Sequence, residues 1–578
     1  MRDLPSDHLH SITHAVPASH NNKVIPDWLA DLFILVLAAV AVGLPMLIYG
    51  PMTRGHDTVE HLNFTRHFAD QFWGGEWYPR WLLDMNHGLG SASFFVYPPL
   101  PAYVFALLRP VELLFHFSAF RLQEFLALFG SGVTAFVWVR TMARRQIAVA
   151  CGVLYMLMPY HLTVDFYRRT ALPECWALLW MPLILYFTVN VMRRRRGSVL
   201  GLALAFALVI LSHLVSVLIF SLIPLLIALV FSVSGQKLQS VVRVTLGMIL
   251  GTGLSFVYLF PAVLHSKNFQ VSRLFSFYNY DLFNNLVGVA KVPQGIMRTI
   301  TFTFFDMVLF VTICGSATLY EQWSQTKKST IFWLLICSVP IFLMTKLSYP
   351  LWQHASWFYA GIQFPWRLNI LVCVGVLPIL ATFLSSPSRI TTPYRALPLA
   401  LLAVIVATWC AAYAQVWSHY RTELYPLPSV GVSEDDGWFD AWSPPGMDQQ
   451  SALNASKGPR ARFLNGEGLP EIILWKARHI EIQASSKSGS PVMVNQFYYP
   501  RWTATLLAPD SSRPLKIHAA MPEGLLQVEV PPGLQRIRFD IPVDAPERAS
   551  GWISASCAVL FAILCLRLKS QRVRHPLL

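Results

Sequence analysis

The stretch Trp28–Tyr49, WLADLFILVLAAVAVGLPMLIY, decides the class of fold. Asp31 is its only charged residue. A helix needs roughly 20 mostly apolar residues to cross the hydrocarbon core of a bilayer, so this stretch predicts a membrane-spanning helix. Mostly polar residues 1–27 come before it, and no small-residue cleavage site follows it, which favours a retained anchor over a removable signal peptide.

Similar apolar runs recur along the chain. Of the 578 residues, 54% are hydrophobic and only 13% are charged, and the mean hydropathy is +0.46. These values are typical of an integral membrane protein with many spans. The further candidate spans are 122–142, 147–160, 172–192, 199–212, 213–233, 241–264, 299–320, 331–347, 366–384, 396–417 and 552–566. We therefore predict an α-helical polytopic membrane protein with about 12 transmembrane helices.

The net charge of +14 indicates orientation here and does not predict nucleic-acid binding. Lys and Arg gather in short loops between the apolar runs, such as RTMARRQ (140–146) and RRRRGS (193–198), and in the tail RLKSQRVRHPLL (567–578). By the positive-inside rule these segments face the cytoplasm. We expect a multi-pass plasma (inner) membrane protein with both termini cytoplasmic.

This orientation depends on the segment 94–117, which begins FFVYPPLPAYVFALL. The run 94–108 is apolar, but it is short and is broken by Pro98, Pro99 and Pro101. If it crossed the membrane, the basic loops would all move to the outside, against the positive-inside rule. We therefore predict a re-entrant or juxtamembrane segment within a first extracytoplasmic loop spanning 50–121.

The polar block 418–550 differs from the rest of the chain. Its short runs EIILW, HIEIQA, PVMVNQFYY, LLQVEV and RIRFDI are separated by Gly, Pro, Ser and Asp, as strands are. We predict a C-terminal extracytoplasmic β-rich domain, most simply a sandwich. The predicted organisation is a cytoplasmic tail (1–27), a transmembrane domain (28–417), the β-rich domain (418–550), and a final transmembrane helix with a basic cytoplasmic tail (551–578).

The first loop opens with the motif GHDTVEH, residues 55–61. On a helix, Asp57, Glu60 and His61 share one face, where they could position a general base or bind a divalent cation such as Mg or Mn. Asp57 with Glu60 three residues later is also the pattern of a capping box, which starts a helix without any catalysis. The spacing leaves both interpretations open.

A second motif, PYHLTVDFYRRTALPE (159–174), lies in the next outside loop. Its Asp165, Arg168, Arg169 and Glu174 would sit at the same membrane face as Asp57. Arginines beside carboxylates suit a substrate that carries phosphate, because guanidinium groups bind phosphate oxygens in pairs. An interfacial ion pair between Asp165 and Arg169 is the structural alternative.

Four further residues are weaker candidates. Arg80 in WYPRW and Arg367 in FPWRL are flanked by Trp, as in an interfacial aromatic belt. His213 sits at a helix end. Asp306 is the one acidic residue clearly inside a predicted span, where a carboxylate is costly and suggests a functional or paired role.

Together the motifs GHDTVEH, WYPRWLLDMNHGLG, FFVYPPL, PYHLTVDFYRRTALPE, IQFPWRLN and FYYPRW resemble bacterial membrane proteins labelled 6-pyruvoyl-tetrahydropterin-synthase-related. The arrangement of loops and spans resembles the GT-C superfamily of polyprenyl-phosphate-sugar-dependent glycosyltransferases. One departure is that Arg168, Arg169 and Thr170 stand where this resemblance leads us to expect Arg-Gly.

The resemblance implies transfer of a sugar from a polyprenyl-phosphate donor to a glycan or lipid-linked acceptor at the membrane. It implies catalytic roles for Asp57 and Asp165, which are also the candidate metal ligands. Glu60, His61, Arg80, Arg168, Arg169, Glu174, His213 and Arg367 are the candidate substrate-binding residues. No nucleotide cofactor is expected, because no phosphate-binding loop or dinucleotide motif is present. The alternatives are a transporter of lipid-linked sugars and a non-catalytic glycan-binding envelope protein.

Overall fold

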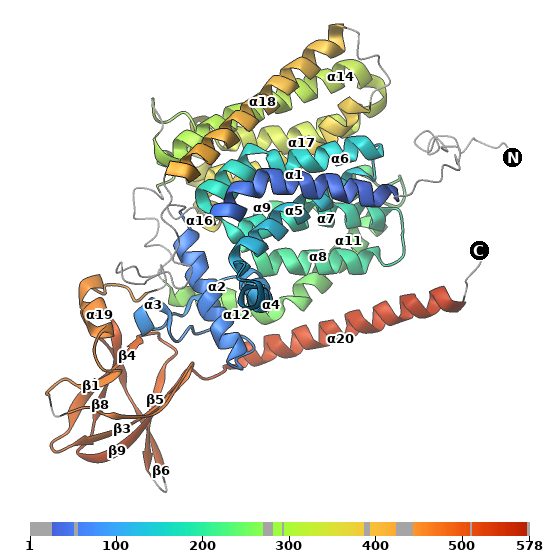
Figure 1. Ribbon diagram of the computed structural model, residues 1–578. Helices are drawn as coiled ribbons and strands as arrows, with labels where there is room; N and C mark the ends of the chain where they lie inside the picture. Colours follow the sequence, from blue (N-terminus) through green and yellow to red (C-terminus); the bar gives the residue numbers. More distant parts are fainter. Residues whose placement is uncertain are drawn as a thin grey trace.

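The computed structural model describes residues 26–50, 56–269, 281–291, 294–385, 393–422, 443–466, 468–508 and 511–574. Side chains at 321–326, 393–395, 419–422 and 571–574 are outside this description. Most of the predicted N-terminal tail, 1–27, lies outside it too. Figure 1 shows a layer of long helices, with a β-sandwich at one end of it.

The helical layer is a membrane domain. Within the described ranges, nine helices are long and apolar enough to cross a bilayer, and a tenth forms if α11 and α12, bent by 74°, make one span. The expected number of twelve is therefore not confirmed, partly because α8 has only 15 residues. The bounds are α1 (Asp27–Tyr49), α5 (Ala119–Val139), α6 (Arg145–Leu157), α7 (Leu172–Met192), α8 (Ser198–Ser212), α9 (Leu214–Phe220), α10 (Leu222–Phe231), α11 (Lys237–Leu254), α12 (Phe256–His265), α14 (Gly295–Leu343), α17 (Asn369–Leu384), α18 (Pro393–Thr422) and α20 (Ala545–Arg574).

Helix α14 takes in the predicted span 299–320 and most of the predicted span 331–347 in one element of 49 residues. It folds back on itself. A Cβ atom placed on Gly315 would lie 2.6 Å from Cδ2 of Leu334, whereas 19 positions along a straight helix extend about 28 Å. Both halves of α14 pack against α17, through Thr318, which donates to the carbonyl of Ile379, and through Cys337 beside Gly375.

The first loop contains α2 (Thr58–Trp73), α3 (Met85–Gly88) and α4 (Leu100–Phe115). Helix α4 is not among the candidate spans, and it runs across the long helices, which Figure 1 shows by presenting it nearly end-on. Its last turns expose Leu113, Leu114 and Phe115. This placement agrees with the expectation that the segment 94–117 lies against the bilayer without crossing it.

The predicted β-rich region is confirmed as two antiparallel sheets. One sheet has the order β1-β4-β8-β7 and the other has the order β2-β3-β9-β5-β6. Alternate residues point into the shared core, as Ile537 and Phe539 do from β9. The bounds are β1 (Ala461–Phe463), β2 (Glu471–Lys476), β3 (His479–Ser486), β4 (Ser490–Phe497), β5 (Thr503–Ala508), β6 (Ser511–Leu515), β7 (Ile517–Ala520), β8 (Leu525–Val530) and β9 (Gly533–Asp540), and a short helix α19 (Gln449–Ser456) precedes them.

The first loop completes the core of this sandwich. Trp81, Leu89 and Phe95 are fully buried among the strand side chains. The indole of Trp81 donates to Oε1 of Gln496 at 2.7 Å, and the amide nitrogen of Gln496 donates to the carbonyl of Gly88 at 2.8 Å. The sandwich is therefore joined to the first loop through a common core.

A buried ionic cluster adds to this junction. Glu547, at the start of α20, lies 3.3 Å from Arg80 of the first loop, 3.0 Å from Arg478 of the sandwich and 3.3 Å from Arg501. Its side chain is only 3% exposed. Breaking a buried pair of this kind leaves an uncompensated charge, so the cluster ties the sandwich to the membrane domain.

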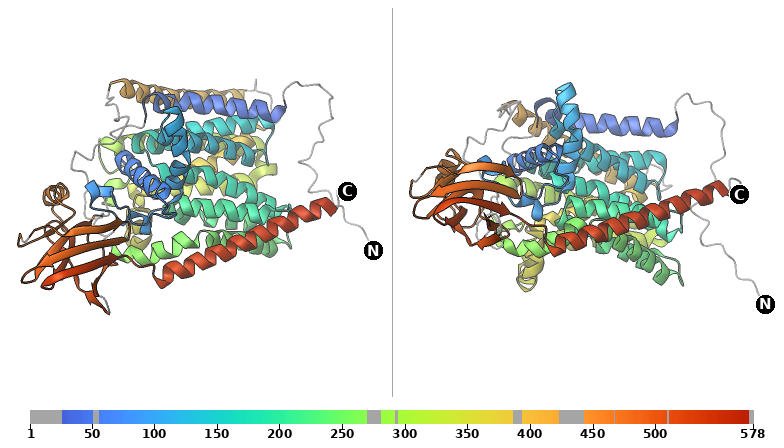
Figure 2. Two further views of the ribbon diagram at one scale, coloured as in Figure 1. Left: turned by 60° about the horizontal axis from the view of Figure 1, so that its bottom comes forward. Right: turned by 90° about the horizontal axis from the view of Figure 1, so that it is seen from below.

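The two ends of the membrane domain differ in charge. The first loop and the sandwich lie at one end, whereas the start of α1 and the end of α20 lie at the other (Figures 1 and 2). The basic loops gather at this second end, where Arg145 pairs with Asp27 and Asp31 and where Arg193 donates to the carbonyl of Thr141.

Candidate functional site

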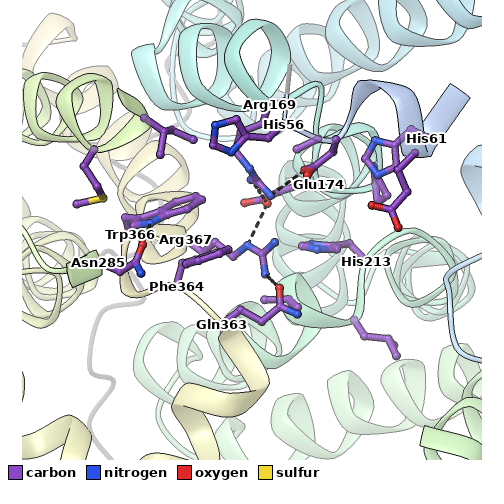
Figure 3. A pocket seen from close by; sticks show the side chains of 18 of the residues that line it. His56, His61, Arg169, Glu174, His213, Asn285, Gln363, Phe364, Trp366 and Arg367 are labelled. Carbon is purple, nitrogen blue, oxygen red and sulfur yellow. Dashed lines mark hydrogen bonds and ion pairs between the residues drawn. The ribbon is translucent and has the colours of Figure 1, made fainter. Parts of the chain in front are cut away.

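A cavity of about 940 Å³ opens between the start of α2, the start of α7 and the segment that precedes α17. Seven of the ten predicted site residues line it: Asp57, Glu60, His61, Arg169, Glu174, His213 and Arg367. They come from four separate stretches of the chain, 57–61, 169–174, 213 and 367. Figure 3 shows their side chains gathered around the cavity.

Arg169 is the centre of the ionic network. It ends η2 (Tyr160–Arg169), a π-helical segment that follows α6. Its Nη1 lies 2.8 Å from Oδ1 of Asp165 and 2.8 Å from Oε2 of Glu174, and its Nη2 lies 3.4 Å from Oδ2 of Asp57. The guanidinium also lies over the ring of Trp366, 5.1 Å from its centroid. One arginine therefore connects the carboxylates of both predicted motifs.

Glu174 is the second junction of the network. Its Oε1 accepts a hydrogen bond from the hydroxyl of Tyr160 at 2.7 Å. Its Oε2, already bound by Arg169, lies 3.5 Å from Nε of Arg367. Glu174 is thus held by two arginines, and its side chain is only 1% exposed.

Asp57 occupies the boundary between this network and the cavity. Helix α2 begins at Thr58, as the capping interpretation requires, but the side chain of Asp57 makes no capping hydrogen bond. It faces Arg169 instead and is 31% exposed. Its backbone N–H donates to the carbonyl of Arg169 at 2.9 Å, which pins the start of α2 against η2. The capping-box interpretation is therefore wrong, because its side-chain hydrogen bond from Asp57 is not made.

Three predicted residues do not line the cavity. Asp165 lies behind Arg169 and is fully buried, with Oδ2 unpartnered among the described residues. Arg168 is exposed, because adjacent positions of a helical segment point in different directions and Arg169 takes the inward one. Arg80 pairs with Glu547 beneath the sandwich. The structure thus corrects two expectations. Arg168 and Arg80 do not reach a substrate in the cavity, and Asp165 makes no direct catalytic contact there.

His61 joins α2 to the turn after η2. Its Nδ1 lies 2.7 Å from the carbonyl oxygen of Thr170, and its Nε2 lies 2.6 Å from the hydroxyl of Tyr97. Burial lowers the pKa of His61, and the neighbouring Arg169 lowers it further, against the opposing effect of Asp57. A neutral ring suits both contacts, since it donates from one nitrogen and accepts at the other.

The residues present do not favour the predicted divalent cation. Asp57 and Asp165 both point at the guanidinium of Arg169, whose positive charge lies where a shared cation would have to sit. Across the described ranges, no group of three or more His, Cys, Asp or Glu side chains could hold a metal ion. Asp306, in α14, does not line the cavity.

Comparison with known families agrees with the motif resemblance. The chain matches the family described as 6-pyruvoyl-tetrahydropterin synthase related domain, a membrane protein, over residues 94–416, which is more than half of its length. This chain belongs to the 6-pyruvoyl-tetrahydropterin synthase related family. No curated protein matches it.

The range shared with the 6-pyruvoyl-tetrahydropterin synthase related family contains Arg169, Glu174, His213 and Arg367. Asp57, by contrast, lies outside it, as does the β-sandwich. The site therefore combines residues of the family's shared region with a carboxylate that precedes it.

Sequence reasoning missed several residues that line the cavity: His56, Tyr97, Asn285, Gln363, Phe364 and Trp366. His56 and Trp366 stand inside motifs that the sequence displays, GHDTVEH and IQFPWRLN, so adjacency to Asp57 and Arg367 could have found them. Asn285 carries no such signal. It enters the site because its Oδ1 accepts from the indole of Trp366 at 3.2 Å.

Proposed function

We propose that this protein is a GT-C-like membrane glycosyltransferase that moves a sugar from a polyprenyl-phosphate carrier to an envelope or lipid-linked acceptor. The observation that supports it most is Asp57, a partly exposed carboxylate at the edge of a large cavity, held in place by a buried arginine. A carboxylate in such a position can accept a proton from a substrate hydroxyl.

The proposed step is a displacement at the anomeric carbon. The acceptor oxygen forms the new bond to that carbon while its proton passes to Asp57. The bond from the carbon to the phosphate oxygen breaks, and the phosphate leaves with the electron pair. Charge develops on the leaving phosphate and on the oxocarbenium-like sugar, so fixed cations near the phosphate favour the transition state.

The other carboxylates act as positioning residues in this proposal. Asp165 and Glu174 hold Arg169, and Arg169 in turn holds Asp57. Asp165 thus acts through Arg169 and does not touch the substrate. A rigid frame of this kind keeps a general base within the narrow range of positions that proton transfer requires.

The membrane setting suits a lipid-linked donor. The cavity has apolar walls that include Leu214, Val215, Ile296 and Met297, beside its ionic groups. It is lined by Glu174 at the start of α7, whereas the basic run 193–196 follows the other end of that helix, so the cavity lies at the end away from this basic loop. By the positive-inside rule that end is extracytoplasmic, so the proposed reaction takes place on the outer face of the membrane.

The test is Asp57→Asn in the purified full-length protein. Asn keeps the size of the side chain, and Arg169 keeps its contacts with Asp165 and Glu174, so the variant should fold and insert. Loss of a general base typically lowers a rate by roughly 100-fold to 10,000-fold, and we expect a fall of that size in glycan transfer from a polyprenyl-phosphate donor.

The matched control is Asp70→Asn, which removes an exposed carboxylate from the same helix, α2. It should transfer at the wild-type rate. Wild-type transfer by Asp57→Asn would show that Asp57 is not the base, and no transfer by the wild-type protein with any polyprenyl-phosphate sugar would contradict the proposed activity itself.

A further inference from the structure

The cavity contains two arginines whose surroundings differ. Arg169 is saturated: three carboxylates bind its guanidinium, and its side chain is only 5% exposed. Its single positive charge is therefore more than balanced by its neighbours. Arg169 can position Asp57, but it has little capacity left to bind a substrate anion.

Arg367 is not saturated. Its Nη1 donates to two neutral oxygens, the carbonyl of Ile362 at 3.1 Å and Oε1 of Gln363 at 2.6 Å. In the described part of the chain its one ion pair is with Glu174, 3.5 Å from Nε, and Nε makes no hydrogen bond. Among the described residues, Nη2 of Arg367 has no hydrogen-bond partner, although the side chain is 93% buried and lines the cavity.

Two neutral side chains lie beside this guanidinium. Gln363 presents its oxygen to Arg367, which leaves its amide NH₂ as a donor without a partner in the described part of the chain. Its φ of +64° is unusual for a residue other than glycine, and such backbone strain concentrates at functional sites. His213 accepts or donates through Nδ1 with Ser216 at 2.8 Å, and its ring lies beside Arg367 in the cavity (Figure 3).

An aromatic stack holds the two arginines apart. The rings of Phe364 and Trp366 are nearly parallel, with centroids 4.7 Å apart. Arg169 lies over Trp366 at 5.1 Å, and Arg367 lies 5.3 Å from the centroid of Phe364. Each guanidinium therefore packs on its own ring, which favours a fixed orientation for both through cation–π attraction.

From this arrangement we infer that Arg367, Gln363 and His213 form an anion-binding subsite that takes a phosphate group, and that Phe364 and Trp366 position it. Arg367 supplies the charge and a free N–H edge, and the Gln363 amide supplies a further donor. The inference deepens the proposed function and rests on it for one point, namely that the phosphate is the leaving group of the donor. It assigns that role to Arg367 in place of Arg168 and Arg169.

Equilibrium binding to the full-length protein in nanodiscs tests the inference without any transfer reaction. The probes are labelled polyprenyl phosphate, the corresponding polyprenol without phosphate, and inorganic phosphate as a competitor. A hydrogen bond to a charged group contributes about 1.5–3 kcal/mol, so Arg367→Gln should weaken polyprenyl phosphate binding by roughly 10-fold to 100-fold and leave polyprenol binding unchanged. Arg367→Lys should restore part of the affinity, since it keeps the charge and loses the fork.

Gln363→Glu is a second variant, in case Arg367→Gln fails to fold. It keeps an oxygen for Arg367 but replaces the amide donor with a negative charge, so it should also weaken binding of the phosphate form alone. Arg168→Gln is the control, because Arg168 is exposed outside the cavity and its loss should change nothing. Competition by millimolar inorganic phosphate would show that the phosphate group alone is recognised, and its failure would show that the lipid chain is needed as well.

The inference is overturned if the wild-type protein binds polyprenyl phosphate no better than polyprenol. It is also overturned if folded Arg367→Gln and Gln363→Glu proteins bind polyprenyl phosphate as the wild-type protein does, or if Arg168→Gln weakens binding equally. Phosphate-specific binding that depends on Arg367, in a wild-type protein that transfers no sugar, would uphold the subsite and contradict only the proposed glycosyltransferase activity.

Discussion

Thr170 ends the stretch Arg168–Arg169–Thr170, which stands where the motif resemblance leads us to expect Arg-Gly. Its φ of +56° lies in the left-handed region that glycine adopts most easily. The threonine side chain provides a partial compensation, because its Oγ1 accepts a hydrogen bond from Thr58 at 2.8 Å. The turn that follows Arg169 thus forms without a glycine.

Next to this turn, His61 predicts a pH dependence of stability. Its pKa in the folded protein is held below the ordinary value of 6.5, mainly by burial. Below pH 6.5 the unfolded chain therefore binds a proton that folded His61 resists, so the free energy of unfolding should fall as the pH drops, by up to about 1.4 kcal/mol per pH unit. Above pH 6.5 this contribution should be flat.

The measurement is the unfolding free energy of detergent-solubilised protein between pH 7.5 and 5.5. His61→Gln should show a shallower decline than the wild-type protein, whatever its absolute stability. His518→Gln, on the exposed side of β7, is the control and should keep the wild-type slope. Equal slopes for His61→Gln and the wild-type protein would mean that His61 titrates normally in the fold.

At the scale of helices, glycine determines how closely α5 and α6 approach. A Cβ atom on Gly152 of α6 would lie 2.7 Å from the backbone oxygen of Gly132 in α5 and 3.0 Å from Cδ2 of Leu35 in α1. Backbone cannot move aside as a flexible side chain can. Small residues at helix contacts are how membrane helices pack closely.

Gly152→Ala should therefore destabilise the membrane domain by about 1–3 kcal/mol, the usual cost of overpacking. The control is Gly551→Ala in α20, where an added Cβ meets no atom within 4 Å. Because alanine favours helix more than glycine does, the control should be neutral or slightly stabilising. Thermal unfolding of the two variants in one detergent compares them, and equal midpoints would refute the close approach.

At the scale of the whole molecule, the chain separates charge along the direction of its helices. The basic loops, the start of α1 and the end of α20 lie at one end, and the first loop and the sandwich lie at the other. The cavity, which is lined by Glu174 at the start of α7, is at this second end. The sandwich is held by a shared core and by Glu547, so its side of the membrane is also the side of the cavity.

This arrangement predicts the topology. A reporter fused after Arg196 should be cytoplasmic, and one fused after Ser456, ahead of β1, should be extracytoplasmic, because the positive-inside rule places the basic loops in the cytoplasm. Paired alkaline phosphatase and green fluorescent protein fusions measure the two sides independently. Reversed signals would move the cavity to the cytoplasmic face and would contradict the proposed use of an outward-facing donor.

What the sequence determined by itself follows from local pattern. The length of the apolar runs predicted a multi-span helical membrane protein, and period-two alternation predicted a β-rich C-terminal region, because both signals need only neighbouring residues. Of the ten candidate residues named from the sequence, seven line one cavity in the structure. The count of twelve spans is not confirmed, since some apolar runs form helices that are short for a span, such as α8 with 15 residues.

Only the tertiary structure decided which groups meet. It turned Arg169 inward and Arg168 outward, placed Arg80 in the cluster around Glu547, and brought Asn285 against Trp366. It also completed the sandwich core with Trp81, more than 400 positions from Gln496 in the chain. Such contacts depend on the packing of distant segments, which is driven by the burial of apolar surface and the pairing of buried charges. No single stretch of sequence therefore predicts them.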